Sequence, residues 1–176
     1  AQWLRARGHA VHLGRRVQSL ARDDAGWHVD GEPFDAVLLA TGSAEAARLV
    51  ACAATPAAER TGLQAWAATA QALRFGAIAT VYAEQPGAHG ALLPLPMLAL
   101  RHRGGRPAQF VFDRARLDGT AGLLAFVVSA FEGERARLER EVLAQAAEDL
   151  RLPGLRVVQT VVEKRATFAC TPALAR

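Results

Sequence analysis

The chain has 176 residues, of which 51% are hydrophobic and 22% are charged, with a net charge of +4 at pH 7. This length corresponds to one domain, or one domain with part of another, and the composition excludes an intrinsically disordered chain. The 21 Lys and Arg residues are scattered among acidic residues and are not interleaved with aromatic ones, so we expect no nucleic-acid partner. No apolar run reaches the roughly 18 residues that a membrane-spanning helix needs.

The start of the chain and its cysteines indicate how the chain arises and in which cell compartment it lies. It begins at Ala1, and Met97 is its only methionine, so we expect a processed chain or a piece of a longer protein. No signal peptide is predicted, because no apolar core follows a basic start. Cys52 and Cys170 lie too far apart in the sequence for a redox or metal motif. We therefore expect two reduced and partly buried thiols in a cytoplasmic protein, with peripheral membrane contact left open.

The first 33 residues predict a helix end and a small antiparallel meander. The opening helix ends before Gly8, and short extended runs follow at 10–13, 17–20 and 27–30. Clusters of Gly, Asp and Pro separate these runs and predict turns between them.

A buried strand followed by a helix is predicted next. The apolar run Phe34–Ala40 is typical of a strand covered on both faces in a parallel sheet. It ends at Thr41-Gly42, and Ser43 is a good N-cap for a helix over 44–52. In α/β folds such a strand, turn and helix bring the backbone against a ligand.

The remaining residues predict an antiparallel sheet with packed helices, which is an α+β fold. Apolar residues from Leu63 to Leu73 recur at helical spacing, and the segment from Glu134 to Leu150 has a clear apolar stripe. The predicted strands cover 78–83, 97–100, 108–113, 123–129 and 155–168. A hairpin-like connection is expected at Gly104-Gly105.

Common cofactor and catalytic motifs are missing from the sequence. No two glycines are spaced as G-x-G, there is no P-loop, and no serine lies in a G-x-S-x-G elbow. His9 and His12 have the closest spacing among the histidines, and we expect both on the surface because a metal site needs three or four ligands. We therefore predict no metal site.

Two segments are unusual. The first is the charged pair Asp113-Arg114 at the end of a predicted strand, which we interpret as a surface ion pair. In the segment Glu163–Phe168, strand alternation places Lys164, the only lysine, on one face with Val162 and Phe168. Lys164 is then either an extended lysine at a sheet edge or a polar group lining an apolar cavity.

These segments carry a resemblance to a known family. The stretches Gln109–Arg114 and Glu163–Pro172 resemble the squalene-associated FAD-dependent desaturases, also called hydroxysqualene dehydroxylases. The stretches 34–41 and 78–82 match in the same order, and the similarity runs from about Gly8 to the end. The turn Ala40-Thr41-Gly42 is also similar to turns of flavin-containing amine oxidases and phytoene desaturases, many of which have Pro in place of Gly42.

The resemblance implies an internal piece of a larger flavoprotein. Residues 1–53 would be the middle of an FAD-binding α/β domain, and residues 54–176 a substrate-binding domain truncated at its C-terminal side. FAD would bind the full-length parent and is not expected on this segment alone.

The resemblance also implies roles for individual residues. Val17 would touch the adenine through its backbone, and Ala40, Thr41 and Gly42 would form the turn that approaches the cofactor. Three residues on the last strand would lie near the flavin or the substrate: Lys164, Arg165 and Phe168.

The activity implied for the parent is the reductive dehydroxylation of hydroxysqualene, an isoprenoid alcohol, to squalene, a hopanoid precursor. A carotenoid-type or phytoene-type desaturase and an amine oxidase-like flavoenzyme remain open alternatives. So does a non-catalytic domain that binds a lipid or a partner. The sequence leaves the catalytic residues and the oligomeric state open.

Overall fold

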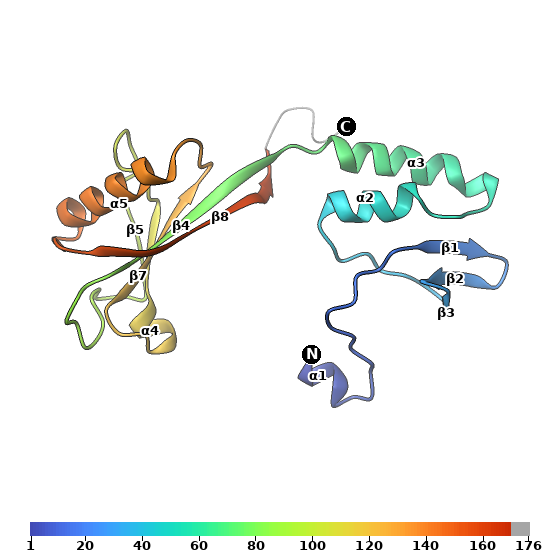
Figure 1. Ribbon diagram of the computed structural model, residues 1–176, viewed down its shortest axis with the longest axis horizontal. Helices are drawn as coiled ribbons and strands as arrows, with labels where there is room; N and C mark the ends of the chain where they lie inside the picture. Colours follow the sequence, from blue (N-terminus) through green and yellow to red (C-terminus); the bar gives the residue numbers. More distant parts are fainter. Residues whose placement is uncertain (170–176) are drawn as a thin grey trace. The chain divides into compact units, whose positions relative to one another are not determined.

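The computed structural model describes residues 1–169 and has an α+β fold, as predicted. The chain divides into two compact units, Ala1–Leu73 and a second from Arg74 onward (Figure 1). The predicted domain division after residue 53 refers to the domains of a longer protein, and it stays a prediction.

The first unit contains an antiparallel meander, but its strands lie further along the chain than predicted: residues 10–13 and 17–19 belong to no strand, and a strand begins within the turn expected at 31–33. The meander follows the short helix α1 (Gln2–Arg5) and consists of β1 (Leu20–Asp23), β2 (Gly26–Val29) and β3 (Glu32–Phe34), paired antiparallel in the order β1-β2-β3. Asp30 and Gly31 join β2 to β3 with φ of 50° and 85°. Two successive positive φ values give a tight hairpin turn, and Asp-Gly is a preferred pair for it.

Two helices complete the first unit, α2 (Ser43–Ala51) and α3 (Ala57–Ala72). They pack through Ala47, Ala67 and Ala70, with Val50 beside them. The cap of α2 is Gly42 rather than the expected Ser43, so the helix begins one residue earlier than predicted.

The prediction of a buried strand over Phe34–Ala40 is wrong for this chain. Strand β3 ends at Phe34, and residues 35–40 belong to no strand. Leu38 is 90% exposed, while Val37 and Leu39 are half-buried. A strand of this kind needs neighbours that take up its backbone N–H and C=O groups and cover its two faces. Within residues 1–169, no strand pairs with this segment.

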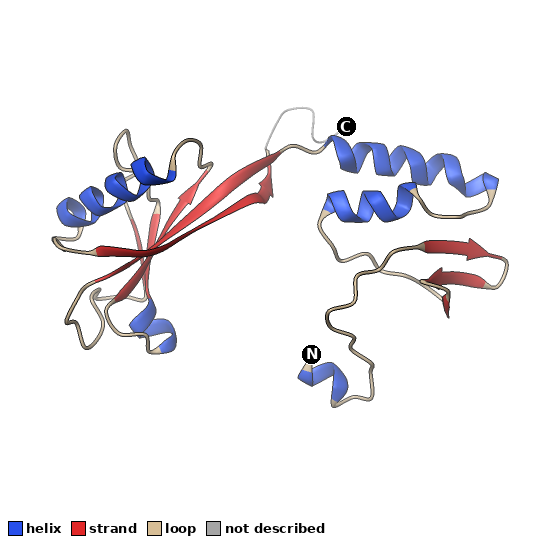
Figure 2. Cartoon of the chain, in the orientation of Figure 1, coloured by secondary structure: helices blue, strands red, loops and turns tan. Residues whose placement is uncertain are grey.

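The second unit is a five-stranded antiparallel sheet with two helices. Its strands are β4 (Phe75–Glu84), β5 (Met97–Ala99), β6 (Phe110–Asp113), β7 (Leu123–Ser129) and β8 (Arg156–Phe168), in the order β5-β6-β7-β4-β8. The helices are α4 (Arg114–Asp118) and α5 (Arg135–Asp149). The predicted strands and long helix are thereby confirmed, whereas α4 was not predicted. Figure 2 shows β4 and β8 running together as a long two-stranded ribbon.

The core of the second unit lies between the sheet and α5. Val81, Leu124 and Phe126 are completely buried and pack with Leu138 and Val142 of the helix. Burial of each of these large side chains contributes about 1.5–3 kcal/mol. Alternation along the strands sends the neighbouring side chains, such as Tyr82 and Val127, to the opposite face of the sheet. Helix α4 lies on that opposite side (Figure 1).

Candidate functional site

In the first unit, the segment that follows β3 runs between two hollows. The first has a volume of about 560 Å³ and the second about 580 Å³. Leu20, Val37, Leu39 and Thr41 contribute to the walls of both. The segment 37–41 therefore has open space on two sides.

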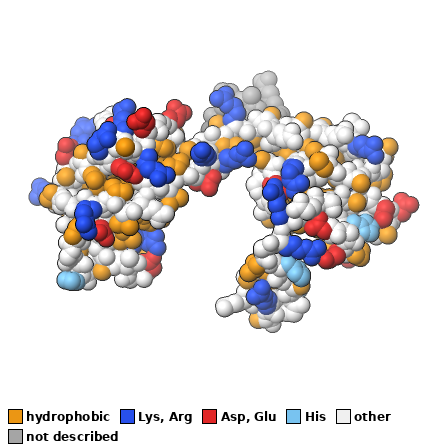
Figure 3. Space-filling model, in the orientation of Figure 1, with side chains coloured by type: hydrophobic (Ala, Val, Ile, Leu, Met, Phe, Trp, Pro, Cys, Tyr) orange, Lys and Arg blue, Asp and Glu red, His pale blue; other side chains and the backbone are white. Residues whose placement is uncertain are grey.

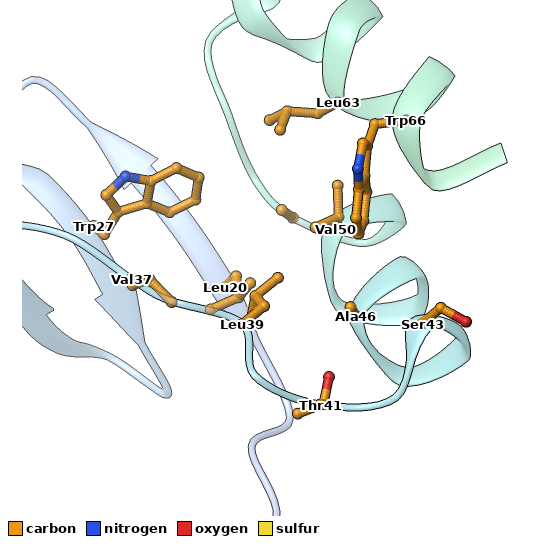
Figure 4. Close-up of a pocket in the computed structure, with 11 residues that line it drawn as sticks. Leu20, Trp27, Val37, Leu39, Thr41, Ser43, Ala46, Val50, Leu63 and Trp66 are labelled. Carbon is orange, nitrogen blue, oxygen red and sulfur yellow. The ribbon is translucent and has the colours of Figure 1, made fainter. Parts of the chain in front are cut away.

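The first hollow has mainly apolar walls. Figure 4 shows Trp27 and Trp66 on opposite sides of it, with Leu20 and Leu39 beneath. Leu63 and Val50 come from α3 and α2. A hollow of this size and character is of the kind that takes an apolar ligand or another segment of protein.

The second hollow has a charged rim. Glu45, in the first turn of α2, accepts hydrogen bonds from Arg16 Nη2 at 2.9 Å and from Arg48 Nη2 at 2.7 Å. The guanidinium of Arg48, followed by that of Arg16, lowers the pKa of Glu45 to about 2. Nη2 of Arg48 also donates to the Val17 carbonyl oxygen at 3.0 Å. The network therefore ties the loop before β1 to the start of α2.

The structure brings two of the predicted cofactor-binding residues to one place. Val17 and Thr41 both line the second hollow. Ala40 and Gly42 flank Thr41 and are exposed. Whether these four residues contact a cofactor stays a prediction.

Gly42 has a conformation that a proline also adopts. Its φ of −59° and ψ of 148° fall in the polyproline region, and its carbonyl oxygen accepts from the N–H groups of Glu45 and Ala46. The glycine therefore leaves the turn with the geometry that proline would give it.

The other predicted site residues lie on β8 in the second unit. Lys164, Arg165 and Phe168 are exposed near the end of this edge strand. Phe168 stands opposite Phe75 of β4, and the Arg165 N–H donates to Glu163 Oε1 at 3.0 Å. Cys170–Pro172 lie outside the described residues. The proposed roles of the three side chains stay predictions.

A third hollow, of about 350 Å³, lies on the sheet face opposite α5. Its floor consists of uncharged side chains of β4, β6 and β7: Thr80, Tyr82, Phe112, Ala125 and Val127. Helix α4 adds Arg114, Leu117 and Asp118 at one side. Arg114 and Asp118 form an ion pair one helical turn apart, with Arg114 Nε 3.0 Å from Asp118 Oδ2.

The expectation of a surface ion pair at Asp113-Arg114 is wrong. Asp113 is completely buried, and its Oδ2 accepts from the N–H groups of Leu92 and Leu93 at 2.7 and 2.8 Å. Its Oδ1 accepts from the Ala115 N–H at 3.0 Å and caps α4. The signal available in the sequence was an Asp at the N-cap position of a short helix.

Gln145 is a second structural residue that the sequence did not reveal. It lies on α5 and is 1% exposed. Its side-chain amide accepts a hydrogen bond from the Ala108 N–H and donates one to the Ala108 carbonyl oxygen. It holds the loop before β6 against the helix. Its place on the apolar stripe was visible, but nothing in the pattern indicated its partner.

Residues 1–169 contain neither a candidate metal site nor a helix that could span a membrane. Among these residues, no group of three or more His, Cys, Asp or Glu side chains is placed to hold a metal ion. No helix in this part of the chain is long and apolar enough to cross a membrane. On the face shown in Figure 3, Lys and Arg side chains are spread out and interspersed with acidic ones.

Comparisons with known proteins indicate the fold. No protein-family model and no curated protein matches the chain. Among solved structures, it is similar to a protein from Exiguobacterium sp. 255-15 provisionally identified as a protoporphyrinogen oxidase, with a TM-score of 0.51 and 16% sequence identity. The match covers 88% of this chain but 35% of that one, so the chain spans about a third of that structure's length. At this identity, the similarity is one of fold.

Proposed function

We propose that the chain is part of an FAD-dependent oxidoreductase that acts on a long isoprenoid. In this proposal, the parent enzyme replaces the hydroxyl group of hydroxysqualene with hydrogen and releases squalene. The fold similarity to a protein named as an oxidase supports the broader part of the proposal. The resemblance of the segments Gln109–Arg114 and Glu163–Pro172 supports the substrate.

The observation that carries the proposal is the unpaired apolar segment before α2. Leu38 is 90% exposed, and Val37 and Leu39 line hollows on two sides. A continuous apolar run of this kind is typical of a central strand of an α/β sheet and is not expected in a polar surface loop. The turn after a strand of this kind is the place where α/β domains meet a cofactor.

The residues around this turn fit the edge of an FAD site. Val17 and Thr41 line one hollow, and a Cβ added at Gly42 would meet nothing within 4 Å. The backbone there leaves room for a cofactor to approach. When bound and reduced, the flavin would supply the hydride that replaces the hydroxyl group, which takes up a proton and leaves as water. This chain's part would be to orient the cofactor and to hold the apolar substrate.

An exposed apolar sheet face in the second unit supports the proposal that the substrate has a long hydrocarbon chain. The sheet face opposite α5 carries Met97, Phe110 and Val161, exposed by 47%, 39% and 44%. Phe112 and Val127 continue this face across β6 and β7. An apolar surface that a protein leaves open marks a place for a ligand or for another part of the protein.

The test uses the full-length parent with FAD. We expect a yellow protein with flavin absorbance that converts hydroxysqualene to squalene when an excess of dithionite is supplied without oxygen. A colourless parent that takes up no FAD would contradict the flavoenzyme proposal. A flavoprotein that leaves hydroxysqualene unchanged but desaturates a carotenoid precursor would replace the dehydroxylase with a desaturase.

A pair of variants of the parent tests the role of the unpaired segment. Leu38→Lys places a charge where the proposal has a buried strand, and we expect it to abolish FAD binding. Ala68→Lys places the same charge on an exposed position of α3, and it should leave FAD binding unchanged. Equal FAD content in both variants would show that the segment is not a buried strand of the cofactor domain.

A further inference from the structure

We propose that the hollow beside α4 binds the hydroxyl group of a long, uncharged alcohol, with its hydrocarbon lying along the sheet. The hydroxyl group would meet the Arg114–Asp118 pair beside the ring of Tyr82. This inference rests on the proposed function and deepens it by placing the hydroxyl group of the substrate on named residues.

The side chains that line the hollow favour a mainly apolar ligand. Phe112, Ala125 and Val127 form a floor without charge, and Thr80 and Tyr82 continue it on β4. Leu117 adds an apolar side chain from α4 and is 55% exposed. Hydrocarbon laid across this floor would remove these side chains from water, at about 25 cal/mol for each Å² buried.

The charges at the hollow determine which polar group it accepts. Arg114 and Asp118 are the charged members of its lining, and they neutralise each other through Nε and Nη2 of Arg114. Asp118 Oδ1 also accepts from the Thr120 hydroxyl at 2.8 Å and from its N–H at 3.2 Å. These contacts lower the pKa of Asp118 to about 2, so the pair is ionised at neutral pH.

A neutral hydroxyl group suits this arrangement better than a charged head group. A carboxylate or a diphosphate would be attracted to Arg114 but repelled by Asp118, and an ammonium group would meet the opposite problem. An alcohol can donate to the carboxylate and accept from an N–H of the guanidinium, which has five N–H donors. Arg114 Cζ lies 6.0 Å from the centroid of the Tyr82 ring, which places that aromatic side chain beside the ion pair.

A single fluorine label can report on this hollow. Tyr82 is the one tyrosine of the chain, so 3-fluorotyrosine gives one ¹⁹F resonance. We would titrate the labelled chain with farnesol, with farnesene as the matching hydrocarbon, and with farnesyl diphosphate as the matching anion. Farnesol should shift the resonance saturably, and the other two should bind at least about tenfold more weakly.

Two variants make the charge argument specific. Asp118→Asn leaves Arg114 without its partner. This variant should bind farnesyl diphosphate about tenfold more tightly and farnesol more weakly. Glu141→Gln removes the matching pair with Arg137 on α5, which covers the other sheet face, and should change neither. Far-ultraviolet circular dichroism identifies any variant that has lost its fold.

The outcomes separate this inference from the proposed function. Equal binding of farnesol and farnesyl diphosphate, equal binding of farnesol and farnesene, or a resonance that does not move would overturn the site. A parent enzyme that makes squalene, with no binding of farnesol here, refutes the site alone. Selective farnesol binding with a parent that takes up no FAD supports the site and refutes the proposed enzyme.

Discussion

The two units bury their apolar residues in different ways. The second unit completely buries large side chains, among them Val81, Leu124 and Phe126. The buried residues of the first unit are mostly small, as at Ala47 and Ala67, while its Leu38 is 90% exposed. The second unit therefore has a core of its own. The first unit has helices and a meander arranged around two hollows.

The aromatic residues allow the two units to be followed separately. All three tryptophans, Trp3, Trp27 and Trp66, lie in the first unit, and the one tyrosine, Tyr82, lies in the second. Tryptophan fluorescence therefore reports on the unit that lacks a large core, and a label on Tyr82 reports on the unit that has one. This separation makes the comparison measurable in one chain.

The largest expected effect is on the core of the second unit. Phe126→Ala should lower its free energy of unfolding by about 3–5 kcal/mol, because the completely buried ring leaves a cavity. Urea denaturation followed at Tyr82 measures this loss. Leu38→Ala in the first unit should change the tryptophan-detected transition by less than about 0.5 kcal/mol. A loss above 2 kcal/mol for Leu38→Ala would show that Leu38 belongs to a packed core.

The next effect concerns the buried carboxylate at the end of β6. Asp113→Ala should destabilise the second unit by about 2–3 kcal/mol, because three backbone N–H groups lose their acceptor. Asp113→Asn keeps one oxygen acceptor and should recover part of the loss. Glu132→Ala removes an exposed carboxylate from the same unit and is the matched control. Equal stability of the alanine variants at 113 and 132 would mean that solvent replaces the bonds of Asp113.

The sequence predicted the second unit well because its signals are local. Strand alternation and the helical stripe of 134–150 are repeated over many residues, and the same residues form the core that fixes these elements. Asp113 and Gln145 could not be placed in this way, since their partners Leu92, Leu93 and Ala108 are 20 to 37 residues distant. Their roles depend on loop positions that only the folded chain defines.

In the first unit, local sequence patterns were not enough to predict the structure. The run Phe34–Ala40 has the composition of a buried strand, but composition does not supply a neighbour to pair with it. The sequence also grouped Val17 with Thr41 only through a resemblance, whereas the structure places both at one hollow. The roles of Lys164, Arg165 and Phe168 likewise came only from the resemblance, and all three side chains are exposed.

A pH dependence is expected for the first unit. The pKa of Glu45 is about 2 in the folded chain, and its ordinary value is 4.5. A lowered pKa contributes stability that is present above about pH 4.5 and is lost as the pH falls towards 2. Glu45→Gln should therefore lower the urea midpoint at neutral pH and flatten its fall between pH 4.5 and 2, measured by tryptophan fluorescence.

The two arginines around Glu45 should differ in effect. Arg48→Gln should flatten the same pH limb more than Arg16→Gln, because Arg48 is the larger cause of the lowered pKa. Arg48 also donates to the Val17 carbonyl, so its variant should weaken the loop before β1 as well. Identical pH profiles for the unaltered chain and for Glu45→Gln would refute this role for the carboxylate.

The smallest expected effect tests the turn before α2. Gly42 has a φ of −59°, so Gly42→Pro restricts the unfolded chain without straining the folded one. We expect the first unit to gain about 0.4–1 kcal/mol, seen as a higher urea midpoint in tryptophan fluorescence. Gly31→Pro is the matched control, and it should destabilise the unit because φ there is +85°. If Gly42→Pro were as damaging as Gly31→Pro, the turn would not have the proline-compatible geometry that its φ and ψ indicate.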